Sequence, residues 1–193
     1  MIDNIVDKVV LQMISENIID DVSYEKYRYT IVSMFESLIT IGTILIIGLL
    51  ARKFGYMLVF CIFFFSLRRR CGGFHLNSFL GCYFASVLTS LIIMQITKVS
   101  ADYIGLELFM MTVAFLVIEI IGTVNHPNIH MNQQELANSK GIARILAAIE
   151  CVIIYVTAYL KLNSGLIAYM TVAVVLCALL MVIAKVCGQD MKV

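Results

Sequence analysis

A histidine and a cysteine lie seven residues apart in the segment Arg68-Arg-Arg-Cys-Gly-Gly-Phe-His-Leu-Asn-Ser-Phe-Leu-Gly-Cys82. A cysteine and a histidine are the minimal pair for a thiolate nucleophile, because the imidazole takes the thiol proton and the resulting imidazolium holds the thiolate. Cationic groups nearby favour the thiolate further, and three arginines precede this pair. The segment therefore predicts nucleophilic chemistry at Cys82, with His75 as the base.

The spacing of these two residues constrains the backbone that must carry them. On a straight α-helix, residues seven apart share a face but are separated by a rise of about 10.5 Å. A catalytic hydrogen bond needs roughly 3 Å. Either the two residues do not act together, or the chain around 72–78 leaves the helix. Gly72 and Gly73 permit the second option, because glycine reaches positive φ without a clash from Cβ.

The composition indicates that these residues belong to a membrane protein. The chain is 61% hydrophobic and 14% charged, with one proline and a mean hydropathy of +0.95. Soluble domains are about 45–50% apolar and about 25% charged. In a bilayer, helices are favoured because their backbone polar groups are satisfied within the segment. We predict an all-α integral membrane protein that forms a single polytopic domain over residues 1–193.

About six transmembrane helices are expected, because one span needs about 20 apolar residues. Residues 1–28 differ, with an amphipathic stretch at 2–20 whose apolar residues recur at i, i+3, i+4 and i+7. This pattern predicts an N-terminal helix lying in the membrane interface, with a helix docked on the protein's own cytoplasmic face as the alternative. The expected spans are residues 31–50, 55–67, 77–97, 103–124, 142–160 and 165–186.

The distribution of lysine and arginine predicts the orientation of these spans. With the N-terminus inside, ten of the fourteen basic residues lie on the cytoplasmic side and four lie outside, as the positive-inside rule requires. Both termini are then cytoplasmic, and the 68–76 segment and a 125–141 loop share that side. No cleavable signal peptide is expected, because residues 1–28 are rich in acids and lack a compact apolar core.

Other function classes find little support. The net charge is +1 and the chain has no phosphate-binding glycine motif, so no nucleic-acid partner is expected. The six cysteines form no CxxC pair, which argues against a disulfide framework or a zinc knuckle. His126 and His130 have i, i+4 spacing but no evident third ligand, so we expect no metal and no cofactor. Buried packing thiols are expected at Cys61, Cys151, Cys177 and Cys187.

Each site residue also has a simpler interpretation when it is taken alone. His75 suits a membrane boundary, Cys82 suits helix packing, and the arginine run suits a positive-inside anchor. Cys71, just before the glycines, is a rival for the nucleophile. Carboxylates inside apolar spans are costly and usually functional or paired, but no role is assigned to those of Glu36, Glu119 and Glu150.

The block RRRCGGFH, with His75 and Cys82 in H-x6-C spacing, resembles the AgrB family of membrane cysteine endopeptidases that mature quorum-sensing propeptides. The similarity extends to the chain length, to the amphipathic N-terminus and to the polar loop Asn125-His-Pro-Asn128. It therefore covers essentially the whole chain. The resemblance implies Cys82 as the catalytic nucleophile and His75 as its base.

The resemblance also implies a substrate and a setting. Family members cleave the C-terminal tail from an AgrD-like propeptide through an acyl-thioester, and a propeptide cysteine then closes a thiolactone ring. The implied tail is acidic, so Arg68, Arg69 and Arg70 are candidates for substrate binding as well as for topology. A homodimer in the bacterial cytoplasmic membrane is expected on the same ground. The alternatives are a small membrane transporter and a non-catalytic membrane scaffold.

Overall fold

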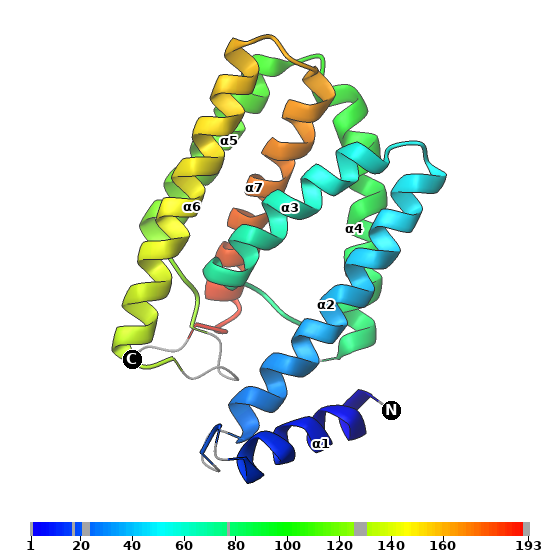
Figure 1. Ribbon diagram of the computed structural model, residues 1–193. Helices are drawn as coiled ribbons and strands as arrows, with labels where there is room; N and C mark the ends of the chain where they lie inside the picture. The colour runs from blue at the N-terminus through cyan, green and yellow to red at the C-terminus, as the bar shows by residue number, and fades with distance from the viewer. Residues whose placement is uncertain (1, 17, 21–23, 77, 126–130, 191–193) are drawn as a thin grey trace.

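The computed structural model of the protein describes residues 2–16, 18–20, 24–76, 78–125 and 131–190. Within these ranges the regular structure is helical (Figure 1). The helices, in chain order, are α1 (Ile2–Ser15), α2 (Tyr24–Leu50), α3 (Phe54–Cys71), α4 (Phe79–Ser100), α5 (Ile104–Ile121), α6 (Gln133–Tyr159) and α7 (Ser164–Val186).

Five of the described helices are long and apolar enough to cross a membrane: α2, α4, α5, α6 and α7. The sequence predicted about six spans, and the difference is α3. This helix contains the expected span 55–67 and packs against α2, α6 and α7. Its last turn contains three arginines, and with them the helix is too highly charged to count as a membrane span by composition alone. The all-helical membrane architecture is as predicted, whereas a membrane-spanning role for α3 stays a prediction.

The core of the bundle is built around α7, which packs most extensively against α3 and α5. Small side chains on α7 let these neighbours approach closely, as is common between helices in membranes. The buried small residues of α7 include Ala168, Ala173, Ala178 and Ala184. Larger apolar side chains on α2, α4, α5 and α6 are exposed on the outside of the bundle, where a bilayer would solvate them.

Two helices, α6 and α2, begin about two turns before the expected spans. The N-terminus of α6 is set by a capping box, in which Asn132 accepts from Glu135 N and the Glu135 side chain accepts from Asn132 N. The first turns of α6 are polar, so hydropathy alone placed its start near residue 142, in what we expected to be a 125–141 loop. The helix α2 begins at Tyr24, before the expected span at 31–50. Its first turns are also polar, so hydropathy alone does not mark them as part of the helix.

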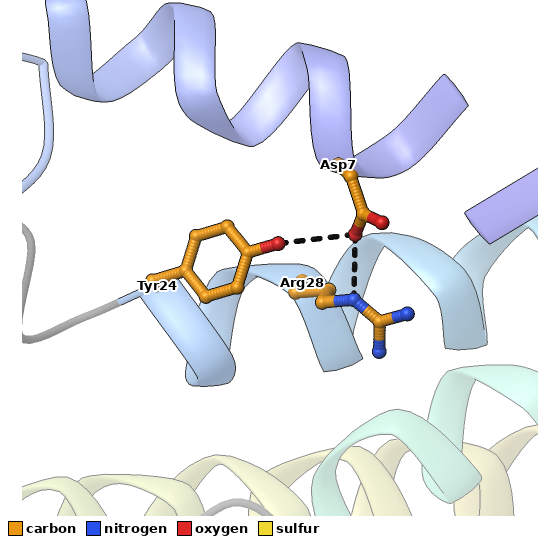
Figure 2. A network of polar contacts seen from close by, with 3 residues as sticks. All are labelled: Asp7, Tyr24 and Arg28. Atoms are coloured by element: carbon orange, nitrogen blue, oxygen red, sulfur yellow. Dashed lines mark hydrogen bonds and ion pairs between the residues drawn. The ribbon is translucent and has the colours of Figure 1, made fainter. Parts of the chain in front are cut away.

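The N-terminal helix α1 is docked against the start of α2 (Figure 2). The Asp7 carboxylate accepts hydrogen bonds from Arg28 Nε at 2.6 Å and from the Tyr24 hydroxyl at 3.1 Å. Val6 and Val10, one turn apart, are fully buried. The helix therefore contacts its own chain, in line with the docked alternative, while its position relative to a membrane interface stays a prediction.

The connections gather at two ends of the bundle (Figure 1). At one end, the α6–α7 connection meets the start of α3, where Asn163 Nδ2 donates to the Tyr56 hydroxyl at 2.9 Å. At the other end, the residues after α5 meet the end of α3, where Val124 N donates to Cys71 O at 2.8 Å. We call this second end the site end, because it holds His75 and Cys82.

Candidate active site

The chain leaves α3 before His75 and enters α4 before Cys82. The last residue of α3 is Cys71, the following residues 72–76 are extended or irregular, and α4 begins at Phe79. Ser78 caps α4 by accepting a hydrogen bond from Gly81 N at 3.2 Å. Cys82 N donates to Ser78 O, so the cysteine lies in the first turn of α4.

The departure from the helix depends on the two glycines. Gly72 has φ +66° and Gly73 has φ +130°, values that residues with a Cβ rarely adopt. A Cβ on Gly73 would lie 1.9 Å from Arg68 Nη1, and one on Gly72 would lie 2.8 Å from Val124 O. Both positions therefore require glycine for conformation and for space, as their predicted role in the loop geometry demands.

Arg68 holds the segment that follows α3. Its guanidinium donates to the carbonyl oxygens of Gly72 and Phe74, so the planar fork of donors bridges two carbonyls of one loop. The side chains of Arg69 and Arg70 are instead exposed. The three arginines, which the sequence suggested as one substrate-binding set, thus divide into one that organises the loop and two that face outward.

The charge of Arg68 lies within electrostatic range of the Cys82 thiol, as well as of Cys177 and Cys71. Both thiols are outside any disulfide, but Cys82 is half-buried whereas Cys71 is completely buried. A nucleophile must be reachable and must lie in a cationic setting. Both cysteines of the predicted block lie near the charge of Arg68, but only Cys82 is also reachable from outside the bundle.

His75 is half-buried in the extended segment, and both of its backbone groups are bonded to the far end of the chain. His75 N donates to Gln189 Oε1 at 3.0 Å, and Gln189 Nε2 donates to His75 O at 2.8 Å. The neighbouring Phe74 N donates to Leu180 O of α7 at 2.9 Å. The backbone that carries His75 is therefore tied to α7 and to the residues just after it.

The break at 72–78 removes the objection that a straight helix would hold His75 and Cys82 too far apart. Both residues lie at the site end on either side of the turn into α4. A hydrogen bond between their side chains stays a prediction. His126 and His130, which the sequence analysis considered as metal ligands, lie outside the described residues.

A third segment closes the site end. Thr123 Oγ1 donates to Arg70 O at 3.0 Å, and Asn125 N donates to Asp190 Oδ1 at 2.8 Å. The fully buried Asn125 side chain also accepts from Met131 N at 3.0 Å. Sequence reasoning missed Asn125, Gln189 and Asp190 as site residues, because polar residues after an apolar helix look like an ordinary loop or tail.

The remaining cysteines depart partly from the expected buried thiols. Cys61 and Cys177 are buried as predicted, and Cys151 is half-buried. Cys187 is exposed, because α7 ends at Val186 and the residue after it lies outside the helix packing.

Two carboxylates within the bundle have polar partners, although Glu150 Oε2 and Glu107 Oε1 are buried without a hydrogen bond in the described part of the chain. Glu119 pairs with Arg144 at 3.7 Å, and Glu150 accepts from Ser66 Oγ. Glu107, which the sequence reading overlooked, is buried at the start of α5 near Ser100 and Thr171. Among the described residues, no three histidine, cysteine or acidic side chains are grouped closely enough to hold a metal ion.

The family model for AgrB, accessory gene regulator B, matches residues 2–185. The chain belongs to the AgrB family. It is thus a membrane protein of a quorum-sensing family, as the RRRCGGFH block predicted. No curated protein and no solved structure matches the chain. The AgrB match ends at residue 185, so Gln189 and Asp190 lie beyond the matched residues.

Proposed function

We propose that the protein is a cysteine endopeptidase that cleaves an AgrD-like propeptide and closes its thiolactone ring. The observation that carries this proposal is the position of Cys82. It is a half-buried free thiol in the first turn of α4, within electrostatic range of Arg68 and after a glycine break that carries His75. Membership of the AgrB family supports the substrate class.

The first half of the reaction releases the propeptide tail. His75 takes the proton from the Cys82 thiol, and the thiolate sulfur attacks the scissile carbonyl carbon. When the carbon–nitrogen bond breaks, the imidazolium returns its proton to the leaving amine. The tail departs, and the propeptide remains attached to Cys82 as a thioester.

The second half closes the ring. His75 deprotonates the propeptide's own cysteine, whose sulfur attacks the thioester carbonyl, and Cys82 leaves as a thiolate that regains the proton. One thioester replaces another, so the exchange is nearly isoenergetic and consumes no water. The corresponding intermediate of a serine nucleophile would be an ester, which a thiol displaces only uphill, so this chemistry favours a cysteine. A site poor in water would protect the intermediate from hydrolysis.

We also propose six spans, with α3 as the second, and cytoplasmic N- and C-termini in a bacterial cytoplasmic membrane. The four basic residues expected outside are all at or near the end opposite the site end, namely Arg52, Lys53, Lys98 and Lys161. The site end then faces the cytoplasm, where a propeptide is made. A homodimer is proposed from family resemblance.

The test is cleavage of a co-expressed AgrD-like propeptide. We expect Cys82→Ala, Cys82→Ser and His75→Ala to abolish release of the tail, while Cys61→Ala and Cys151→Ala retain it as matched cysteine controls. All variants are compared at equal membrane abundance. If Cys71→Ala stops cleavage and Cys82→Ala does not, the nucleophile is Cys71. If neither variant affects cleavage, the protein acts as a scaffold or transporter instead.

A further inference from the structure

We propose that Gln189 is a positioning residue for the catalytic histidine, through which the C-terminus of the chain sets the geometry of the active site. This inference rests on the proposed function, because it gives His75 the role of base. It assigns a role to residues beyond the range that the AgrB family match covers, which ends at residue 185.

The side-chain amide of Gln189 forms hydrogen bonds with both backbone polar groups of His75. The glutamine amide accepts from His75 N at 3.0 Å and donates to His75 O at 2.8 Å, across 114 positions of sequence. One planar amide that binds the donor and the acceptor of the same residue fixes the orientation of that residue's backbone as well as its position. The direction in which the imidazole leaves the backbone is thereby restricted.

Gln189 is itself held by the end of α7. Gln189 N donates to Ala184 O at 2.8 Å, and Gly188 N donates to Lys185 O at 3.2 Å, with Gly188 at φ +71°. These bonds form a Schellman motif, in which a left-handed glycine reverses the chain just after a helix. The glutamine side chain is therefore presented to the loop from a rigid helix end.

The next residue extends the same connection to the α5–α6 loop. Asp190 accepts from Asn125 N at 2.8 Å and pairs with Lys185 Nζ at 3.4 Å. Consecutive residues after α7 thus bind two separate loops at the site end. Because the loop containing His75 follows two glycines with positive φ, these external bonds supply rigidity that its own residues lack.

Rigid support of this kind matters for a base whose proton transfer depends on distance. A misplacement of about 1 Å can reduce a rate about 100-fold, and a site needs supporting contacts to avoid such looseness. Loss of the glutamine pair should therefore impair the chemical step without removing any group that touches the substrate.

The experiment compares cleavage of the propeptide by Gln189→Ala, Gln189→Glu and Cys187→Ala in the full-length membrane protein. The alanine variant loses both bonds, and we expect cleavage per inserted molecule to fall about 10- to 100-fold. The glutamate variant keeps an acceptor for His75 N but loses the donor to His75 O while it is ionised. Cys187→Ala, an exposed change two residues away, should cleave normally.

The pH dependence separates positioning from general destabilisation. Below about pH 5, near the ordinary pKa of a glutamate carboxyl group, the glutamate variant becomes protonated and regains a donor. Its cleavage rate relative to that of the unmodified protein at the same pH should therefore rise as the pH falls. If the alanine variant fails to accumulate in the membrane, the pH dependence of the rate ratio for Gln189→Glu by itself tests whether Gln189 positions His75.

Two outcomes overturn the inference in distinguishable ways. If Cys82→Ala and His75→Ala are inactive but both glutamine variants cleave at the unmodified rate, or if the glutamate ratio is constant with pH, Gln189 does not position the histidine and the proposed function stands. If Cys82→Ala still cleaves, the proposed function fails, and the positioning role fails with it.

Discussion

Arg68 is distinguished from Arg69 and Arg70 by the direction of its side chain rather than by its charge. Its guanidinium reaches the carbonyls of Gly72 and Phe74, and it also lies within electrostatic range of Cys82. The residue thus combines support of the loop with a positive charge near the proposed nucleophile. Arg69 and Arg70 are exposed, so each could still anchor the helix at the membrane surface or bind the substrate.

Arg68→Lys should reduce propeptide cleavage although it preserves the charge. A lysine presents its donors from a single nitrogen and cannot reproduce the planar fork. Loss of one hydrogen bond to a charged group costs about 1.5–3 kcal/mol, which corresponds to roughly a 10- to 100-fold loss if it is expressed in the chemical step. Cleavage is measured at equal membrane abundance, with Arg69→Lys as the matched control.

The opposite result would contradict the role given to Arg68. Normal cleavage by Arg68→Lys, together with a salt-sensitive loss in Arg69→Lys or Arg70→Lys, would assign substrate binding to the exposed pair. Salt is informative because screening weakens exposed ion pairs most strongly.

Gly73→Ala should also impair cleavage, for a steric reason. The added Cβ would lie 1.9 Å from Arg68 Nη1, at a backbone φ of +130°, so the arginine or the loop must move. Strained backbone of this kind costs about 1–3 kcal/mol. The matched control is Gly42→Ala in α2, where nothing lies within 4 Å of the added Cβ; full activity of both variants would contradict a tight loop.

At the scale of elements, α1 is attached to α2 through one acidic residue. The hydrogen bond from Arg28 holds the pKa of Asp7 below its ordinary value of 3.8, opposed by partial desolvation and assisted by Tyr24. A lowered carboxyl pKa means that docking favours the ionised form. The stabilisation is therefore fully present above the ordinary value and is lost as the pH falls through the lowered one.

We expect α1 to detach in acid only as the pH falls below 3.8 and through the lowered pKa of Asp7, and Asp7→Asn to weaken its docking at neutral pH. Hydrogen–deuterium exchange of the α1 amides in lipid nanodiscs measures both effects. Asp102→Asn, at the exposed α4–α5 connection, is the control. Protection of α1 that is unchanged in Asp7→Asn and at low pH would show that apolar contacts such as Val6 and Val10 hold the helix without the ion pair.

At the scale of the whole molecule, the number of spans decides which side of the membrane receives the C-terminus. With α3 as a span, six crossings return the C-terminus to the side of the N-terminus. With α3 excluded, five crossings place it on the opposite side. Cys187 reports on this difference directly, because its thiol is exposed just after α7.

A membrane-impermeant maleimide should label Cys187 from the cytoplasmic side only. A cysteine introduced by Leu162→Cys in a Cys187→Ala background should be labelled from the outside only, since Leu162 is exposed in the α6–α7 connection. Labelling of Cys187 from outside would leave α3 as a non-spanning helix and would contradict the six-span arrangement.

The sequence by itself determined the features that depend on neighbouring residues. Apolar runs mark helices because a bilayer leaves few other ways to satisfy backbone polar groups. The glycines mark a break because only glycine adopts their φ values at little cost. The Arg-Gly-Gly-His-Cys block was sufficient to indicate the AgrB family, although the polar first turns of α6 concealed where that helix begins.

Only the tertiary structure decided which residues support the site. The bonds between His75 and Gln189 and between Asn125 and Asp190 span 114 and 65 positions, and nothing local in a polar tail indicates its partner. The same holds for the inward direction of Arg68 and the burial of Glu107. These contacts exist because the packing of α7 between α3 and α5 carries the C-terminus to the loops, and packing of that kind has no short-range signature in the chain.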